Sequence, residues 1–329
     1  MHDGRVHGPG RLKIASGLAV VKLAVVSKKA GHLQGLPEAA FVFFFLQGKN
    51  DGRTCNKNPE VAPSMYQTLL LIFLSGVVTH GFADQPGPLV IVGGGKMPPQ
   101  AEARFLQLAG GKDARIVVLA QASSRTDRGT AATRSFSERG AAKVDNLRLE
   151  DLSRARQILG QASGIWFPGG SQKQLYEALE KKKLLQQIRT RYLAGVACGG
   201  TSAGAAILSE RMITQSPKKA ALVQGNTPVQ QGLGLIPELI IDQHFLARHR
   251  MDRLLGAVLD SPDRIGVGIS ESTAIVVQQD RCTVLGKGSV VVIDARRAKL
   301  EPAKKGALQS GSGIDISLYR AGQSFRFKP

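Results

Sequence analysis

From Pro88 onward, short apolar runs alternate with longer amphipathic segments, and this alternation restricts the possible fold more than any other feature of the sequence. Runs such as Leu89–Val92 and Gly164–Phe167 end in small residues, and a segment with helical periodicity follows each. This order is typical of βαβ units, in which helices cover both faces of a mostly parallel sheet. From Ile265 the sequence is richer in strands, which indicates hairpins at one sheet edge. We therefore expect an α/β fold with a strand-rich C-terminal edge, and we treat residues 85–329 as one domain.

The first 84 residues do not share this pattern. Residues 1–64 lack sustained periodicity, and we expect them to be a disordered or non-native extension. Met65 begins an apolar stretch that ends near Ala83, so residues 65–84 resemble a secretory signal peptide, although no positive residue precedes the stretch. The alternative is a genuine amino-terminal arm that packs on the domain. Translation from Met65 predicts a secreted or periplasmic protein, and an earlier start predicts a cytoplasmic one. The apolar run is too short for a stable membrane span.

The formal net charge is +19, and most of it belongs to the predicted domain. Residues 85–329 hold 35 of the 44 Lys and Arg residues and 20 of the 25 Asp and Glu residues. An excess of this size can attract nucleic acid, an anionic surface or an acidic substrate. The basic residues are scattered, and no helix-turn-helix, zinc finger or aromatic–basic motif accompanies them. We therefore expect no nucleic-acid partner.

No pattern typical of a metal or dinucleotide cofactor is present in the sequence. Cys55, Cys198 and Cys282 are far apart and form no cluster with metal-ligand spacing, so we expect neither a disulfide framework nor a metal site. The glycines at 93–95 do not fit G-x-G-x-x-G, and Pro98-Pro99 disrupts the helix start that a dinucleotide would need. We expect a protein that works without a cofactor.

The strongest local motif is G-x-S-x-G at residues 200–204, between a predicted strand and a predicted helix. Small residues on both sides of Ser202 allow the tight strand-to-helix turn that exposes a nucleophile. The helix amino terminus adds positive potential, and the N–H of Ala203 can point toward a developing oxyanion. The alternatives are a phosphate-binding loop and plain tight packing.

A serine nucleophile needs a base, and the sequence offers six histidines. Four of them lie before residue 85. His244 ends an apolar strand, where it would face the same rim of an open α/β sheet as the serine, whereas His249 falls inside a predicted helix. Elimination makes His244 the best candidate base, against the alternative of a surface or capping histidine. Arg248, Arg250 and Arg253 follow it and could grip substrate carboxylates, although such a group is more often a solvated helix face.

Three longer segments resemble cyanophycinases and the related aspartyl dipeptidases. They are GGTSAGAAI from Gly199, DQHFLARHRMDRLL from Asp242 and GVGISESTAIVV from Gly266. LVIVGGG, RIVVLAQASS and GIWFPGGSQKQL fit the same family in the same order, so the resemblance covers residues 88–329. It implies a flavodoxin-like sheet related to class I glutamine amidotransferases, with Ser202 as nucleophile and His244 as base.

The resemblance also implies a substrate and the residues that bind it. Gly170 and Ala203 would form the oxyanion hole. The positions that match the family's substrate pocket are Gln172, Asp242, Gln243, Arg248, Arg250 and Arg253. The implied reaction is metal-independent serine exopeptidase cleavage of cyanophycin, a poly-aspartate with arginine on its side chains, into β-Asp-Arg dipeptides. The substrate's arginine would need acidic partners, for which Asp242 and Glu271 are candidates, and a homodimer is a further possibility.

One departure concerns the third member of the triad. The resemblance implies an acid between serine and histidine, somewhat over a dozen residues after Ser202, but residues 211–237 contain no Asp or Glu. Lys218, Lys219 and Ala220 stand at the expected place. Three alternatives follow: a Ser202–His244 dyad, an acid recruited from Glu210 or Glu238, or a weakened or inactive relative. The competing functions are an alpha-aspartyl dipeptidase and a protein that binds such peptides without turnover.

Overall fold

The computed structural model describes residues 22–25, 42–45, 85–217 and 222–328, and the chain forms two units, Met1–Thr79 and His80–Pro329. In the first unit, β1 (Lys22–Val25) pairs antiparallel with β2 (Val42–Phe45). The remainder of the predicted extension and the predicted signal peptide lie outside the described residues. Within the described part of the chain, no helix has the length and apolar character needed to cross a bilayer.

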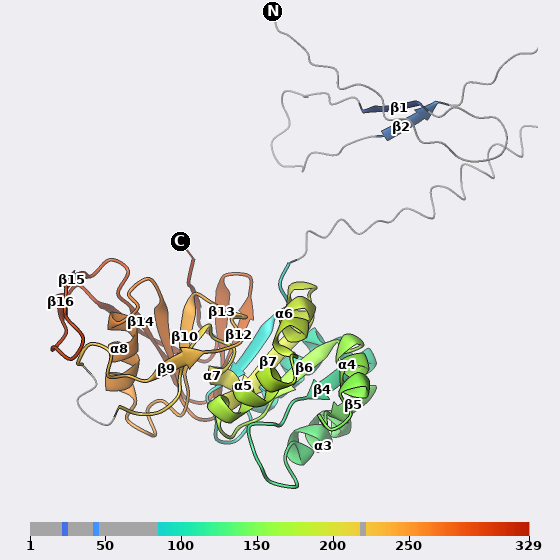
Figure 1. The fold of residues 1–329 in the computed structure, drawn as a ribbon, viewed down its shortest axis with the longest axis horizontal. Coiled ribbons are helices and arrows are strands. Elements are labelled where there is room, and N and C mark those ends of the chain that lie inside the picture. Colours follow the sequence, from blue (N-terminus) through green and yellow to red (C-terminus); the bar gives the residue numbers. More distant parts are fainter. Residues whose placement is uncertain (1–21, 26–41, 46–84, 218–221, 329) are drawn as a thin grey trace, which may run out of the picture. The chain divides into compact units, whose positions relative to one another are not determined.

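The second unit is built on an eight-stranded sheet with the order β18-β13-β12-β3-β7-β6-β4-β5 (Figure 1). Its parallel part consists of β3 (Leu89–Val92), β7 (Ala197–Thr201), β6 (Gly164–Phe167), β4 (Arg115–Val118) and β5 (Lys143–Asn146). Its antiparallel edge consists of β12 (Thr273–Gln278), β13 (Arg281–Gly286) and β18 (Ser324–Arg326). The predicted mostly parallel sheet with a strand-rich C-terminal edge is confirmed.

Helices cover both faces of this sheet, because successive strand residues point to opposite sides. On one face, Phe105 of α2 (Pro99–Leu108) and Phe136 of α3 (Thr130–Glu138) pack edge-on against Trp166, with ring centroids 4.9 and 5.4 Å from the indole. The other face is covered by α4 (Leu152–Gly160), α5 (Gln172–Lys181), α6 (Leu185–Leu193) and the short α7 (Ala203–Ala206). A 3₁₀ turn, η1 (Gly111–Asp113), links α2 to β4.

The helical periodicity of the sequence over about 174–191 predicts one long helix, but the structure has two, α5 and α6. The chain breaks between α5 and α6, where Lys183 adopts a φ of 54°. The break turns Leu184 fully into the core. Periodicity alone missed it because the apolar spacing continues across the turn.

The remaining C-terminal strands form a second, four-stranded sheet, β10 (Leu239–Asp242), β11 (Ile265–Ile269), β14 (Ser289–Asp294) and β17 (Asp315–Arg320). Helix α8 (Met251–Leu259) packs on it so closely that a Cβ at Gly266 would lie 2.6 Å from Val258 Cγ2. Two small hairpins complete the unit, β8 (Arg211–Ile213) with β9 (Val229–Gln231) and β15 (Lys299–Glu301) with β16 (Ser310–Ser312). The strand before His244 therefore lies in this second sheet, beside the central one rather than within it.

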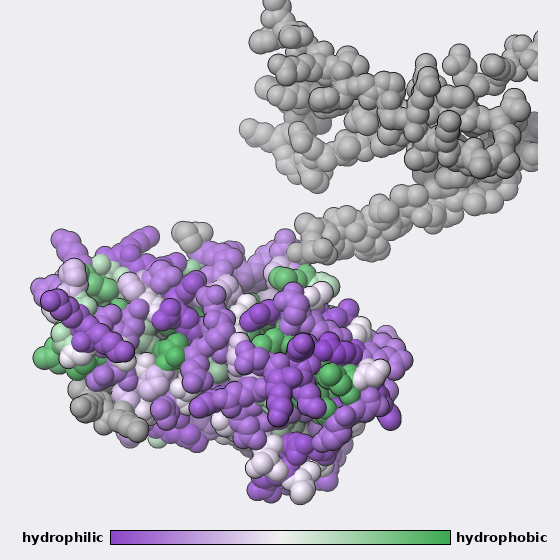
Figure 2. All heavy atoms as spheres, in the orientation of Figure 1, coloured by the Kyte–Doolittle hydropathy of each residue, from purple (hydrophilic) through white to green (hydrophobic). Residues whose placement is uncertain are grey.

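Apolar side chains are concentrated in the interior of this unit. Figure 2 shows a mostly hydrophilic face with small, separate apolar patches. Cys198 and Cys282 are buried and unpaired, and burial raises the pKa of both thiols. Both cysteines therefore act as small apolar core residues.

Candidate active site

Ser202 occupies a sharp turn between β7 and α7. Its φ of 55° and ψ of −115° are sparsely populated for a residue with a side chain, and such strain is common at functional turns. The flanking glycines are required by close approach: a Cβ at Gly204 would lie 1.8 Å from Phe167 O, and one at Gly200 would lie 2.2 Å from Gly204 O. The motif therefore forms the nucleophile elbow that the sequence predicts.

His244 lies directly after β10 and brings its ring to the serine. The distance from His244 Nε2 to Ser202 Oγ is 2.9 Å, a normal hydrogen bond. The ring is largely buried, with 10% of the side chain exposed. His249 was predicted inside a helix, but it lies in the turn before α8 (Met251–Leu259), where it is exposed with a φ of 50° and takes no part in this contact. The structure thus brings together the predicted nucleophile and base.

The third group in line is Glu271, in the turn between β11 and β12. Its Oε1 lies 2.5 Å from His244 Nδ1, on the side of the ring away from the serine. When Nδ1 donates its proton to this carboxylate, Nε2 is left as an acceptor for the serine proton. A Ser–His–Glu arrangement can therefore move a proton between the serine and a leaving group.

This finding corrects the expected source of the acid. Glu210 pairs with Arg264 at 3.0 Å and Glu238 with Lys328 at 2.8 Å, so neither reaches the histidine. Glu271, which the sequence suggested as a partner for the substrate's arginine, is engaged by His244. The acid lies after the histidine in the chain, outside the segment where it was expected. The sequence feature that could have pointed to Glu271 is its position just after an apolar strand, as for His244. Because β11 pairs parallel to β10, the two strands end at the same rim and bring these residues together.

The N–H groups of Gly170 and Ala203 are the predicted oxyanion hole. A Cβ at Gly169 would lie 3.4 Å from Ser202 Cβ, so the 169–170 loop passes next to the nucleophile. Gly170 has a φ of 141°, and a Cβ there would lie 2.2 Å from Ala122 O. Within the described ranges, neither the N–H of Gly170 nor that of Ala203 has a hydrogen-bond acceptor. Both are available for a developing negative charge.

Asp242 and Arg253 form a buried ion pair. The carboxylate accepts from Arg253 Nε at 2.7 Å and from Nη2, and only 5% of the arginine side chain is exposed. Arg250 Nη1 donates to Gln243 Oε1 at 2.6 Å and to the Gln243 carbonyl. Burial, with help from the nearby Arg253, lowers the pKa of Arg250 to about 10. These contacts leave Asp242 engaged by protein arginines, not free for a substrate guanidinium.

The two remaining predicted pocket residues differ in exposure. Gln172 is buried and its Nε2 donates to the Ile213 carbonyl at 2.7 Å, which ties the start of α5 to the β8 strand. Arg248 is exposed, and across the described residues its guanidinium makes no hydrogen bond or ion pair. Among the three arginines, Arg248 is therefore the one free to meet a carboxylate from solution.

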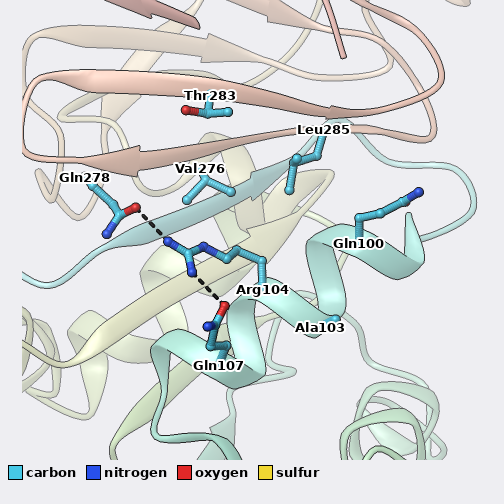
Figure 3. A pocket seen from close by; sticks show the side chains of 8 residues that line it. All are labelled: Gln100, Ala103, Arg104, Gln107, Val276, Gln278, Thr283 and Leu285. Carbon is cyan, nitrogen blue, oxygen red and sulfur yellow. Dashed lines mark hydrogen bonds between the residues drawn. The ribbon is translucent and has the colours of Figure 1, made fainter. Parts of the chain in front are cut away.

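A surface groove of about 470 Å³ lies apart from these residues, between α2 and the β12–β13 hairpin. Figure 3 shows Arg104 reaching from α2 to Gln278 on the strand side and to Gln107 of its own helix, while Val276 and Leu285 also line the groove. None of the candidate catalytic residues lines it.

The fold and the site together define an α/β serine hydrolase: a mostly parallel sheet presents a serine on a strand-to-helix turn, with a histidine and a carboxylate in line. The chain belongs to peptidase family S51, whose model matches residues 89–285. It is a serine-type peptidase of that family.

Curated relatives fall into two groups. Cyanophycinases from Synechococcus elongatus and Geminocystis herdmanii are 36% and 38% identical, over 66% and 59% of this chain and 71% and 74% of their own lengths. A peptidase E from Actinobacillus pleuropneumoniae is 27% identical, over 48% of this chain and 72% of its own length. The fold is similar to that of a peptidase from an acI-B1 actinobacterium, with a TM-score of 0.56, 21% identity, and 74% and 98% of the two chains covered.

Proposed function

We propose that this serine peptidase hydrolyses cyanophycin or related β-aspartyl-arginine peptides to dipeptides through an acyl-enzyme on Ser202. The observation that carries the catalytic part is the position of the His244 ring, 2.9 Å from Ser202 Oγ and 2.5 Å from Glu271 Oε1. The substrate class is supported by the relatives named cyanophycinase, at 36–38% identity, against 26–27% for those named peptidase E.

The proposed reaction proceeds in two steps. Ser202 Oγ attacks the scissile carbonyl while His244 Nε2 takes its proton, and the N–H groups of Gly170 and Ala203 stabilise the oxyanion. The imidazolium then protonates the leaving amine, which departs with the amide C–N bond broken. Water, deprotonated by the same histidine, attacks the acyl carbon, and the imidazolium returns its proton to Ser202 Oγ as the ester bond breaks. Glu271 stabilises the transient imidazolium and fixes its tautomer.

Recognition of the substrate falls to the arginines beside the base. Each arginine side group of cyanophycin carries a free carboxylate, which suits the exposed guanidinium of Arg248, unpaired among the residues that the structure describes. Because Asp242 and Glu271 are both engaged within the protein, we propose that neither binds the substrate guanidinium.

The test is incubation of the purified full chain with cyanophycin and, separately, with alpha-linked Asp-X dipeptides. Release of β-Asp-Arg that is abolished by Ser202→Ala supports the proposal. Cleavage of the alpha-linked dipeptides without cleavage of cyanophycin would show the alternative activity, that of an alpha-aspartyl dipeptidase. If the chain binds these peptides but neither hydrolyses them nor reacts with a fluorophosphonate, it is a binding protein.

A further inference from the structure

The three candidate catalytic residues come from separate strand ends and from both sheets. Ser202 follows β7 of the central sheet, His244 follows β10 of the second sheet, and Glu271 lies where the chain crosses from β11 back to β12. Catalysis depends on sub-ångström alignment of such groups. An element bonded to all three strand ends would hold them in register.

The end of β3 and the loop that follows it bind Ser202, His244 and the residue after Glu271 through backbone hydrogen bonds. The carbonyl of Val92 accepts from Ser202 N at 3.1 Å, and the next carbonyl, that of Gly93, accepts from His244 N at 2.6 Å. The third, that of Gly94, accepts from Ser272 N, the residue after the acid, at 2.9 Å. Three consecutive carbonyls thus bind the backbone beside the nucleophile, the base and the acid.

The glycines of this loop leave the space that the catalytic side chains occupy. Gly94 has a φ of 96°, and a Cβ there would lie 2.4 Å from both Cε1 and Nε2 of His244. A Cβ at Gly95 would lie 2.9 Å from Glu271 Cβ. The imidazole therefore packs directly on the Gly94 backbone, and any side chain at that position would displace it.

We propose that Gly94 is a positioning residue, and that the segment Val92–Gly95 aligns Ser202, His244 and Glu271 for proton transfer. The proposal rests on the catalytic roles assigned above, but not on the identity of the substrate. Gly94 acts through His244 and Glu271. The Gly94 carbonyl binds the turn that carries Glu271, and the lack of a side chain at Gly94 leaves the space in which the His244 ring lies.

The experiment compares Gly94→Ala with Gly140→Ala in the full chain. Gly140 has a similar φ of 88°, and no atom lies within 4 Å of the position that an added methyl group would take, so it carries the backbone strain without the contact. We expect Gly94→Ala to lower kcat, and the rate at which a fluorophosphonate labels Ser202, by about 10²-fold. KM should stay within about twofold, and Gly140→Ala should keep rates within about twofold of the unmodified chain. Equal rates for the two variants would overturn the proposal.

A second comparison covers the case in which Gly94→Ala folds poorly. In a His244→Ala background the imidazole is gone, so the methyl group at position 94 has room. We expect Gly94→Ala to lower the melting temperature in the unmodified chain and to lower it much less in the His244→Ala background. An equal loss in both backgrounds would overturn the proposal. If the protein does not cleave cyanophycin, the labelling and melting comparisons can still be made. That result would contradict the proposed substrate but not the positioning role of Gly94.

Discussion

At the residue scale, the properties of His244 depend on what its two ring nitrogens contact. Nδ1 faces Glu271, whose side chain is 42% exposed, while Nε2 faces Ser202 in a largely buried position. Because Glu271 is partly in water, its electrostatic attraction for the imidazolium is screened. A larger part of its contribution to catalysis therefore comes from fixing the tautomer of His244. The carboxylate is therefore needed for orientation as well as for charge.

Replacing Glu271 tests its role directly. Glu271→Gln keeps the size of the side chain but can donate a proton to Nδ1, which favours the wrong tautomer. We expect kcat to fall by about 10³–10⁴-fold, the scale seen when a triad acid becomes an amide, as measured in steady-state peptide hydrolysis. Glu210→Gln and Glu238→Gln are matched controls and should stay within about twofold. A similar loss in either control would instead favour the acid predicted from the sequence.

The buried pair of Asp242 and Arg253 should matter more for stability than for binding. Asp242→Asn leaves a buried guanidinium without its counter-charge, and we expect the free energy of unfolding to fall by about 3–5 kcal/mol in urea titrations. Asp127→Asn, which breaks the pair with Arg125 that is exposed on both sides, is the control and should leave the free energy of unfolding nearly unchanged. Unchanged stability in Asp242→Asn would mean that the carboxylate is not held by the protein.

Arg248 should show the opposite behaviour. Its guanidinium is exposed and unpaired within the part of the chain described, so Arg248→Gln should leave the unfolding free energy within about 0.5 kcal/mol. We expect KM for β-Asp-Arg peptides to rise by about tenfold with little change in kcat, because a charge-assisted contact to substrate is lost. Arg297→Gln, another exposed arginine, is the control for net charge. A KM that changes equally in both variants would assign the effect to general electrostatics.

At the scale of elements, the site depends on turns more than on the helices and strands themselves. The elbow, the 93–95 loop and the β11–β12 turn are all short, and each is fixed by backbone hydrogen bonds or by glycine contacts. The interior of each element supplies the rigid frame. The break between α5 and α6 is a case in point, since it lets Leu184 fill the core beneath the helix layer.

Truncating Leu184 should therefore destabilise the unit although it lies in a helix break. Leu184→Ala removes a fully buried side chain, and we expect the unfolding free energy to fall by about 2–5 kcal/mol. Leu193→Ala removes a leucine that is 54% exposed, and it should change stability by less than about 1 kcal/mol. Chemical denaturation of both variants measures the difference. Similar values would show that the break is not anchored by the core.

At the scale of the whole molecule, the candidate site lies where two sheets meet. The central sheet supplies the serine, the second sheet supplies the histidine, and the crossover between them carries the glutamate. Loss of packing between the sheets would separate the nucleophile from its base. On heating, activity should therefore be lost at or below the temperature at which the second unit unfolds cooperatively.

The amino-terminal segment gives a prediction that concerns the whole chain. If residues 65–84 act as a signal peptide, the protein isolated from its native host should begin at or close to Gln85. Intact-mass measurement together with amino-terminal sequencing checks this. A natural amino terminus upstream of Met65 would favour the alternative arm.

The sequence by itself determined the alternation of strands and helices, the elbow at Ser202 and the base at His244, because these depend on local spacing and on a small choice of residues. The sequence also shows three glycines at 93–95, but it does not show that they lie against the catalytic side chains. Only the tertiary structure decided the acid, since Glu271 reaches His244 through the parallel pairing of β10 with β11, a contact between strands from different parts of the chain. It likewise decided that Asp242 is paired with Arg253 and that Arg248 is free, because burial is a property of packing. The local sequence pattern identifies candidate catalytic and binding residues. Which of these residues contact one another depends on which strand ends meet at the same rim of the sheets.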